Sequence, residues 1–226
     1  MIHQATVPEW AAERGRNMNF FPSPDPCRTA LIVIDMQRYF MAEGQPLANP
    51  YARGIVPNIN RIVAAMRKAG VPVYWIRHTN ARSGPQALPA WKREMPLVAM
   101  GYDRLLPGAP GHDVDPSLDR LPGDPVIDKF RYSCFIQHSS DLHDRLQAVG
   151  IDTIIIVGTL TNGCCECTVR DASMIGYKVL GVADAMAAVT DEEQAAALLG
   201  MRIGFADIVT TEEIIDRMTQ DEAARS

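Results

Sequence analysis

The stretch that decides the fold is Thr153-Ile154-Ile155-Ile156-Val157-Gly158-Thr159-Leu160-Thr161-Asn162-Gly163-Cys164-Cys165-Glu166-Cys167-Thr168-Val169-Arg170-Asp171-Ala172. Its first five residues form an apolar run that is typical of a buried parallel strand, and the residues from Cys164 onward have the apolar spacing of a helix. Cys164 is therefore expected on the turn between the C-terminal end of a strand and the start of a helix, where open α/β sheets bind ligands. Because a helix N-terminus carries partial positive charge, we expect it to favour the thiolate of Cys164, which is the nucleophilic form of a thiol.

The alternation of strand and helix patterns continues on both sides of this stretch. Apolar runs predict strands over 29–35, 71–76, 126–127, 151–157, 177–182 and 206–209. Helical periodicity predicts helices over 55–69, 139–149, 164–175, 191–203 and 214–218. Strands that alternate with helices imply a mostly parallel sheet that is covered on both faces. We therefore predict an α/β fold with three layers, α/β/α, around a mostly parallel six-stranded sheet.

Two segments fall outside this alternation. Residues 1–28 have mixed charge and lack the basic start and apolar stretch of a signal peptide, so we expect an N-terminal arm that lies on the surface or on a neighbouring subunit. Residues 29–226 are expected to form a single domain. The segment 79–125 carries eight prolines and is long for an irregular connection. It is either an ordered flap over the site, an oligomer contact or a surface excursion.

The composition narrows the class of protein. The chain has 226 residues, of which 47% are hydrophobic and 22% charged, and its net charge of −5 argues against a nucleic-acid partner. No apolar run approaches the roughly 20 residues that a membrane-spanning helix needs. The five cysteines are odd in number and clustered, which is unlike a disulfide framework, so a reducing cytoplasm is the expected location.

A cysteine nucleophile needs a group that takes its proton. Among the histidines, His78 comes closest because it follows the second predicted strand; it is either a base or a polar residue at the rim of the sheet. Asp35 ends the first predicted strand, and Lys129 ends the third. The C-terminal ends of neighbouring parallel strands lie side by side, so these two side chains and Cys164 are expected to converge.

Three motifs then resemble one known family. They are Ile34-Asp35-Met36-Gln37-x-x-Phe40, Lys129 followed by Tyr132-Ser133-Cys134-Phe135, and Thr161-Asn162-x-Cys164 with Thr168-x-Arg170-Asp171-Ala172. In this order they resemble the isochorismatase-like cysteine hydrolases, a superfamily that includes nicotinamidase, N-carbamoylsarcosine amidohydrolase and ureidoacrylate amidohydrolase. The resemblance runs from about Thr29 to the C-terminus and does not cover the arm or much of the 79–125 segment.

The resemblance implies a catalytic triad of Asp35, Lys129 and Cys164. Lys129, as a cation, is expected to lower the pKa of Cys164, and Asp35 to take the thiol proton and pass it to the leaving amine. The family also implies an oxyanion hole formed by the backbone N–H groups of Leu160 and Cys164, and a cis peptide bond between Thr159 and Leu160. It further implies a homo-oligomer, either a dimer or a tetramer. The expected ligand is a small-molecule substrate.

Side chains near strand ends and matched motifs are candidates for the substrate pocket. Arg131 is placed to pair with a substrate carboxylate, or else is a surface or subunit-contact residue. Ordinary core packing is the alternative for the aromatic candidates. Gln37 is placed to orient the loop of Asp35. The full set of pocket candidates is Phe40, Trp75, His78, Arg131, Tyr132 and Phe135.

No metal or other cofactor is expected. Nicotinamidases of the family carry a metal site built on an Asp-x-His motif, whereas the second predicted strand is followed here by Arg77-His78-Thr79-Asn80. Three thiols at Cys164, Cys165 and Cys167 would not converge on one ion, because on a helix Cys165 points about 100° away from Cys164. Cys165 and Cys167 are expected to pack as small apolar groups.

These observations favour a cytoplasmic amidohydrolase that acts on C–N bonds other than peptide bonds. It would cleave a small linear amide or N-carbamoyl (ureido) compound through a thioester and release ammonia or an amine. Three alternatives stay open: a vinyl-ether hydrolase of the isochorismatase type, a thiol redox protein that uses Cys164 with Cys165 or Cys167, and a catalytically silent binding module.

Overall fold

The computed structural model describes the backbone of residues 2–4 and 6–225, and side chains up to residue 219. Its centre is one sheet of six parallel strands in the order β3-β2-β1-β4-β5-β6. The prediction of a six-stranded parallel sheet is therefore confirmed. The strands are β1 (Thr29–Ile34), β2 (Val73–His78), β3 (Val126–Lys129), β4 (Thr153–Thr159), β5 (Lys178–Ala187) and β6 (Asp207–Val209).

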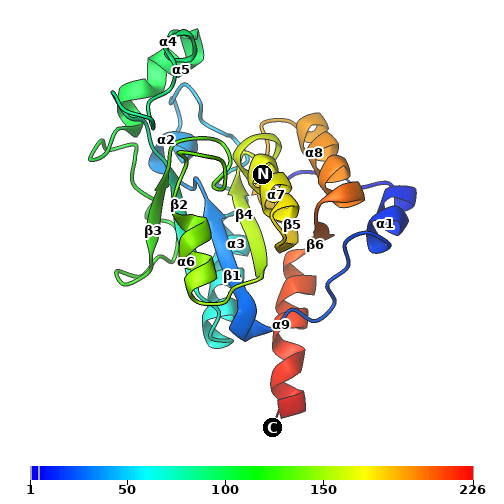
Figure 1. Ribbon diagram of the computed structural model, residues 1–226. Helices are drawn as coiled ribbons and strands as arrows, with labels where there is room; N and C mark the ends of the chain where they lie inside the picture. Colours follow the sequence, from blue (N-terminus) through cyan, green and yellow to red (C-terminus); the bar gives the residue numbers. More distant parts are fainter. Residues whose placement is uncertain (1, 5, 226) are drawn as a thin grey trace.

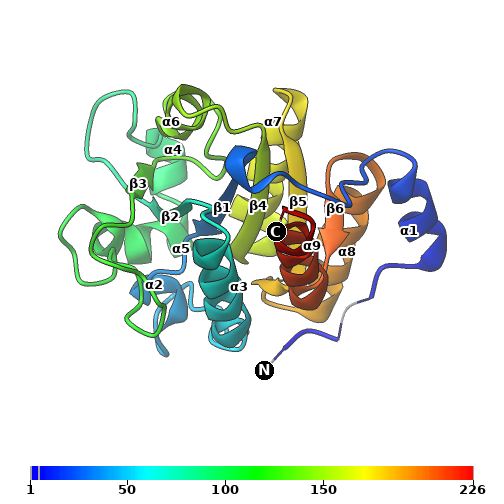
Figure 2. The same ribbon diagram turned by 90° about the horizontal axis from the view of Figure 1, so that it is seen from below.

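Helices cover both faces of the sheet, as predicted (Figure 1 and Figure 2). One face packs against α6, α7 and α8, and the other against α3 and α9. Two 3-10 turns cover Pro26–Arg28 and Tyr102–Leu105, and a π-helical turn, η3, covers Thr161–Cys165. The α-helices are α1 (Glu9–Arg16), α2 (Arg38–Met41), α3 (Val56–Lys68), α4 (Ala90–Arg93), α5 (Pro96–Gly101), α6 (Leu142–Ala148), α7 (Glu166–Met174), α8 (Asp191–Gly204) and α9 (Thr211–Arg225).

Several boundaries differ from the predicted ones. Strand β2 runs to His78, so this residue ends the strand instead of following it. Helix α6 begins at Leu142 instead of 139, because the hydroxyls of Ser139 and Ser140 donate to backbone carbonyls of residues 133 and 134 and hold the chain in a turn. The predicted helix over 164–175 begins with the wider η3 turn before α7 continues it.

The N-terminal arm folds back onto its own domain. Helix α1 lies beside α8, as Figure 1 and Figure 2 both show. His3 stacks on the ring of Tyr51, with 3.9 Å between ring centroids, and its Nδ1 lies 2.6 Å from the Asp191 carboxylate. The arm therefore closes over the β6 side of the domain. No helix in the described part of the chain is long and apolar enough to cross a membrane.

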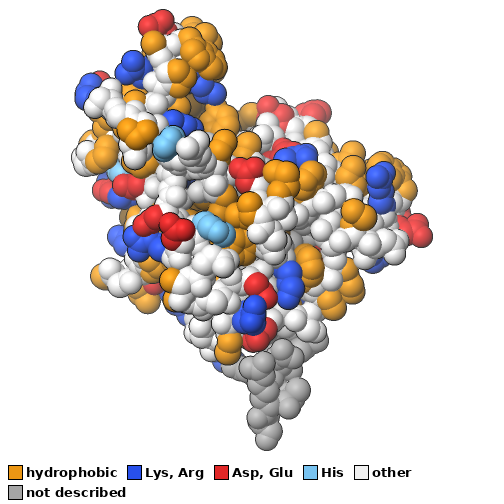
Figure 3. Space-filling view, viewed as in Figure 1, with side chains coloured by type: hydrophobic (Ala, Val, Ile, Leu, Met, Phe, Trp, Pro, Cys, Tyr) orange, Lys and Arg blue, Asp and Glu red, His pale blue; other side chains and the backbone are white. Residues whose placement is uncertain are grey.

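The 79–125 segment is ordered and forms a projection beyond the C-terminal end of β2. It contains α4 and α5, which stand out from the body of the molecule in Figure 1. Figure 3 shows hydrophobic side chains gathered on this projection. On α4 and α5, the side chains of Trp91, Leu97 and Met100 are each more than half exposed. Helical structure inside this segment was not predicted, since its helices are short and separated by prolines.

The chain reverses its direction of travel across the sheet between β1 and β4. After β1 it adds β2 and β3 on one side, and it then crosses over to add β4, β5 and β6 on the other. Gly158 lies at this junction with φ +120°, and a Cβ atom there would lie 2.1 Å from the Ile34 carbonyl oxygen. Glycine thus lets β4 approach β1 at the point where ligands bind in open α/β sheets.

Candidate active site

Asp35, Lys129 and Cys164 meet at this switch point. Asp35 directly follows β1, Lys129 ends β3, and Cys164 lies in η3 directly after β4. The Lys129 Nζ atom is 2.8 Å from Asp35 Oδ2 and 3.3 Å from Cys164 Sγ. All three side chains are buried, with exposed fractions of 0% for Lys129, 1% for Asp35 and 8% for Cys164. The structure therefore brings together the three side chains that the sequence placed at strand ends.

Asp35 is held by a tight turn of the chain. Its backbone has φ +53°, a left-handed conformation that non-glycine residues adopt at a cost. Its N–H donates to the Ile76 carbonyl, and the Gln37 N–H donates to the Asp35 carbonyl. This turn directs the carboxylate from the end of the central strand toward Lys129.

Gln37 fixes the loop of Asp35, as the sequence suggested. Its fully buried side chain accepts a hydrogen bond from the His78 N–H at 2.7 Å and donates to the carbonyls of His78 and His112. Gln37 thereby ties the end of β1 to the end of β2 and to the loop that carries His112.

The electrostatics of the resting site correct one prediction. Burial is the largest influence on Cys164 and, together with the negative charge of Asp35, raises the pKa of the thiol well above its ordinary value; Lys129 opposes this only in part. Lys129 does lower the pKa of Cys164, as expected, but the expectation that the site favours the thiolate overall is wrong, because desolvation of the thiolate outweighs its attraction to the ammonium. Burial also raises the pKa of Asp35, while Lys129 lowers it.

Lys129 and His78 have pKa values that are shifted in opposite directions. Burial alone would lower the pKa of Lys129, but the charge of Asp35 reverses this and raises it above its ordinary value. Burial, followed by the charge of Lys129, lowers the pKa of His78 well below its ordinary value. At neutral pH the site thus holds an ammonium, a neutral imidazole and a neutral thiol beside the Asp35 carboxyl.

The turn after β4 carries Cys164 and begins with an unusual peptide bond. The Thr159–Leu160 peptide bond is cis. The Leu160 carbonyl accepts from the N–H groups of Gly163 and Cys165, whereas the Leu160 N–H has no backbone partner among the described residues. Thr168, one helical turn after Cys164, donates its hydroxyl to the Cys164 carbonyl at 2.7 Å and packs beside Cys134.

Two residues support this turn in roles that were not predicted: Asn49, which the sequence did not single out, and Thr168, which was named only as part of a motif. Asn49 donates to the Thr159 hydroxyl and to the Ala187 carbonyl, both at 2.9 Å, and is 1% exposed. It lies in a loop with no periodic pattern, so no signal in the sequence pointed to it. Thr168 was detectable, since a threonine four residues after Cys164 faces the same side of a helix.

Some pocket candidates reach the site and others do not. His78 lies 3.2 Å from Lys129 Nζ through its Nδ1, and the rings of Phe40 and Tyr132 flank it with centroids 6.4 Å away. Trp75 instead packs in the core and donates its indole N–H to Asp124, so it is not a pocket residue. Phe135 packs against Tyr177 with ring centroids 5.4 Å apart and belongs to the α6–α7 face.

Arg131 has a structural task. Its guanidinium donates to the carbonyls of Pro85, Gln86 and Phe130 at distances between 2.7 and 2.9 Å. It therefore anchors the start of the 79–125 segment, and these bonds already engage both terminal nitrogens of the guanidinium.

The cysteines next to Cys164 have different surroundings. Cys165 is fully buried in the core, as expected for packing, and Cys167 is only half-buried. Burial raises the pKa of both thiols, so neither is an activated thiolate.

The residues of the site do not fit a metal ion. Within the described residues, the one group of three or more potential ligands comprises Asp35, His78 and Cys164, whose ligand atoms lie within 4.8 Å of one another. The ammonium of Lys129 already lies among these three groups, so a divalent cation there would face a buried positive charge. An Asp-x-His sequence does occur at Asp141-Leu142-His143, but His143 contacts the Tyr177 hydroxyl and does not belong to this group.

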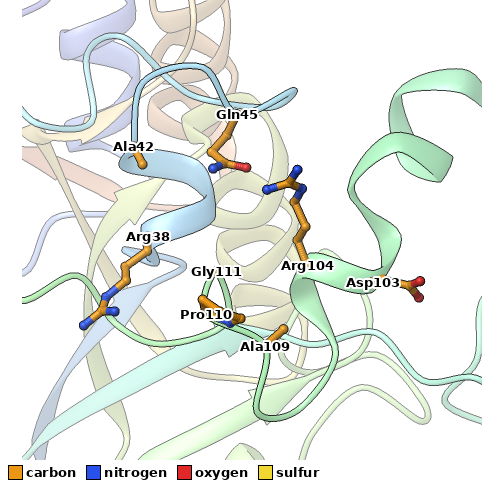
Figure 4. A pocket seen from close by; sticks show the side chains of 8 residues that line it. All are labelled: Arg38, Ala42, Gln45, Asp103, Arg104, Ala109, Pro110 and Gly111. Carbon is orange, nitrogen blue, oxygen red and sulfur yellow. The ribbon is translucent and has the colours of Figure 1, made fainter.

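Two cavities in the described part of the protein are lined by other residues than the triad. One, of about 390 Å³, lies next to α2; Figure 4 shows Gln45 and Arg104 pointing toward each other across it, whereas Asp103 points away. The other, of about 410 Å³, is lined by Arg38, Arg77 and Arg120 together with Asp113 and Asp115. The triad itself is largely closed off from solvent.

Comparisons with known proteins agree with this geometry. A family model described as the isochorismatase domain matches residues 29–213. Nicotinamidase 3 of Arabidopsis thaliana is 29% identical over 188 residues, which cover 82% of this chain and 86% of that protein. Ureidoacrylate amidohydrolase RutB of Pseudomonas savastanoi pv. phaseolicola is 31% identical over 84% of this chain and 85% of its own.

A solved structure extends the agreement to three dimensions. The cysteine hydrolase from Pseudomonas syringae pv. phaseolicola aligns with a TM-score of 0.81 and 33% identity, over 90% of this chain and 97% of that one. The matched region contains all six strands and the three side chains that meet at their ends. By its fold, its matched domain and its relatives, this chain belongs to the isochorismatase family of hydrolases.

Proposed function

We propose that the protein is a cysteine-dependent amidohydrolase that cleaves a small linear amide or N-carbamoyl compound and releases ammonia or an amine. The observation that supports this most is the contact of the Lys129 ammonium with both Asp35, at 2.8 Å, and Cys164, at 3.3 Å, in a buried site. A nucleophile, a proton acceptor and a fixed cation are the groups that acyl transfer requires.

The reaction begins from the neutral thiol. Asp35 takes the proton from Cys164 as the sulfur attacks the substrate carbonyl, and the Lys129 ammonium stabilises the negative charge that passes between them. The carbonyl oxygen becomes an oxyanion, which the N–H groups of Leu160 and Cys164 hold. Burial raises the pKa of Asp35, so the carboxyl is a stronger base than it would be in water, which favours this transfer. Burial also raises the pKa of Cys164, which opposes the transfer, and the Lys129 ammonium offsets this in part by stabilising the thiolate.

The intermediate then collapses in two steps. Asp35 returns the proton to the leaving nitrogen, the C–N bond breaks, and the acyl group stays on Cys164 as a thioester. Water attacks this thioester with Asp35 as the base, and the sulfur leaves as a thiol after it regains a proton. The net reaction consumes one water and needs no cofactor.

The proposal extends to the surroundings of the site. Phe40, His78 and Tyr132 are proposed as the substrate contacts, since their rings lie together beside Lys129. We also propose that the protein acts in the cytoplasm as a homo-oligomer, a dimer or tetramer, with the exposed Trp91 and Met100 of the projection as candidates for a subunit contact.

The test is a screen followed by a substitution. Small amides, ureido acids and N-carbamoyl amino acids are assayed for ammonia release, and the best substrate is then given to Cys164→Ala. We expect a loss of at least about 10⁴-fold in kcat, because removal of a covalent nucleophile has effects of this order or larger. Cys167→Ala is the matched control and should keep wild-type activity, since Cys167 is only half-buried and lies outside the triad.

The same variant separates the alternatives. A vinyl-ether hydrolase of the isochorismatase type needs no thiol and releases no ammonia, so hydrolysis of a vinyl ether by Cys164→Ala at the wild-type rate, with no ammonia released in the screen, would contradict the proposal and favour that reaction. A redox protein would consume peroxide together with a reductant and would show no hydrolysis in the screen.

A further inference from the structure

The ammonium of Lys129 has four close polar neighbours. Besides Asp35 and Cys164, its Nζ lies 3.2 Å from His78 Nδ1 and 3.1 Å from the Arg131 carbonyl. An ammonium group donates hydrogen bonds and accepts none. Its three N–H groups serve at most three of these four neighbours. A hydrogen on His78 Nδ1 would point at a positive group 3.2 Å away, so we assign the lone pair of Nδ1 to the side that faces Lys129.

This contact fixes the tautomer of His78. The imidazole is neutral, since burial and the charge of Lys129 lower its pKa well below the ordinary value. A neutral imidazole carries one hydrogen, and with Nδ1 as the acceptor that hydrogen is on Nε2. Lys129 thus turns His78 into a fixed hydrogen-bond donor.

The donor has no partner within the described part of the protein. His78 is only 9% exposed, yet its Nε2 makes no hydrogen bond to a described residue. This nitrogen is not completely buried, so a bound molecule can reach it. A ring nitrogen of His78 lies within 4.8 Å of Cys164 Sγ. The imidazole ring is thus a neighbour of the sulfur, and a carboxylate a few bonds away from a carbon bound at Cys164 is the kind of group that the Nε2–H can meet.

The charges around His78 select the kind of acceptor. Lys129, Arg131 and Lys92 all place positive charge near its ring. Lys92 reaches over from the 79–125 projection, with its Nζ 4.9 Å from the centroid of the Tyr132 ring. A hydrogen-bond donor in a positive surrounding favours an anionic oxygen over a neutral one.

We propose that His78 is a specificity-determining residue, held by Lys129 as the Nε2–H tautomer, which donates a hydrogen bond to a carboxylate of the substrate. This inference rests on the proposed function, because it takes Cys164 as the atom beside which the substrate binds. It adds that substrates with a carboxylate close to the scissile bond are preferred over their uncharged carboxamide counterparts.

Two alkylating reagents test this without any substrate. Iodoacetate carries a carboxylate, whereas iodoacetamide carries a neutral carboxamide in the same position. Both reagents alkylate the sulfur through their CH₂ carbon and release iodide. The ratio of their rates at Cys164 is independent of how much thiolate is present, because that fraction is common to both reactions. Cys27, an exposed thiol of the same chain, is the internal reference, with both sites followed by peptide mass spectrometry.

In the wild type, the ratio of the iodoacetate rate to the iodoacetamide rate should be at least about tenfold higher at Cys164 than at Cys27, as expected for one hydrogen bond to a charged group. His78→Asn keeps an acceptor near Nδ1 but removes the distal donor, so the preference should disappear. His78→Gln keeps an amide donor near the Nε2 position and should retain the preference to within about threefold.

His143→Gln, which removes an imidazole outside the site, should match the wild type. An equal ratio at Cys164 and Cys27 in the wild type, or an unchanged ratio in His78→Asn, would overturn the proposal. ¹⁵N NMR of the His78 ring gives a second readout, for which the hydrogen is expected on Nε2; a hydrogen on Nδ1 at neutral pH would also overturn it. Neither measurement involves hydrolysis, so this proposal and the proposed function can fail separately.

Discussion

At the scale of single residues, Lys129 determines the state of the site. It is a fully buried cation whose charge is balanced by the buried carboxylate of Asp35 at 2.8 Å. The same ammonium orients the thiol of Cys164 and the imidazole of His78. A buried pair of this kind contributes more to the arrangement of a site than to stability, but the loss of one partner leaves the other uncompensated.

Lys129→Met is therefore expected to lower the free energy of unfolding by about 3–5 kcal/mol, since it leaves a buried carboxylate without a counter-charge. The double variant Asp35→Asn/Lys129→Met should be more stable than Lys129→Met alone. Urea denaturation measures both. Lys178→Met is the control, because Lys178 forms a half-exposed ion pair with Asp152, at 3.6 Å, and its loss should cost about 1 kcal/mol or less. If the double variant is less stable than Lys129→Met alone, the energetic coupling between Asp35 and Lys129 is contradicted.

The sequence identified the residues whose position follows from topology. Asp35, Lys129 and Cys164 each end or follow an apolar run, and parallel strands bring such ends together, so their convergence was predictable. The pKa direction of Cys164 was not, because it depends on how completely the thiol is buried. Trp75 was misplaced for a related reason: an aromatic residue in a strand faces either the site or the core, and the sequence does not show which.

At the scale of elements, the junction of β1 and β4 positions the acid and the nucleophile. Asp35 follows β1 and the η3 turn follows β4, so the distance between these two strands sets the distance between the two groups. Most strands and helices were predictable from their periodicity, whereas the short helices α2, α4 and α5 were not, since four to six residues carry too little periodic signal.

Gly158→Ala is expected to disturb this junction. The new Cβ would lie 2.1 Å from the Ile34 carbonyl oxygen, and φ +120° is unfavourable for alanine. Gly176→Ala is the matched control, since Gly176 also has a positive φ, +101°, but has open space around it. We expect Gly158→Ala to lose at least about 2 kcal/mol more than Gly176→Ala in urea denaturation, because it adds a steric clash to the backbone strain. Equal losses would show that close approach of the strands is not what requires glycine here.

At the scale of the whole molecule, folding buries titratable groups, among them His78 and Lys129, and thereby shifts their pKa values. The two layers of helices and the 79–125 projection leave His78 only 9% exposed beside the buried Lys129. The layers were predictable from the alternation of elements. The position of the N-terminal arm along α8 was not, because it depends on contacts between His3, Tyr51 and Asp191 that no local pattern reveals.

The lowered pKa of His78 makes stability depend on pH in a defined direction. The unfolded chain takes up a proton at His78 near its ordinary value of 6.5, whereas the folded protein does so only at lower pH. The contribution is therefore present above pH 6.5 and is lost as the pH falls toward the lowered folded value. Between pH 6.5 and the lowered folded pKa, each unit of falling pH should cost the wild type up to about 1.4 kcal/mol more of its free energy of unfolding than it costs His78→Gln. Urea titrations at several pH values compare the two, and parallel curves would contradict the assignment of a neutral buried imidazole.

The central claim of the account is that Cys164 carries the acyl group of the substrate during turnover. Rapid acid quenching under turnover, followed by intact-protein and peptide mass spectrometry, measures this directly for the best substrate of the screen. We predict a mass increase equal to the acyl or carbamoyl group, located on the peptide that contains Cys164 and absent from Cys164→Ala. Full turnover with no adduct on Cys164, together with undiminished hydrolysis by Cys164→Ala, would contradict the account.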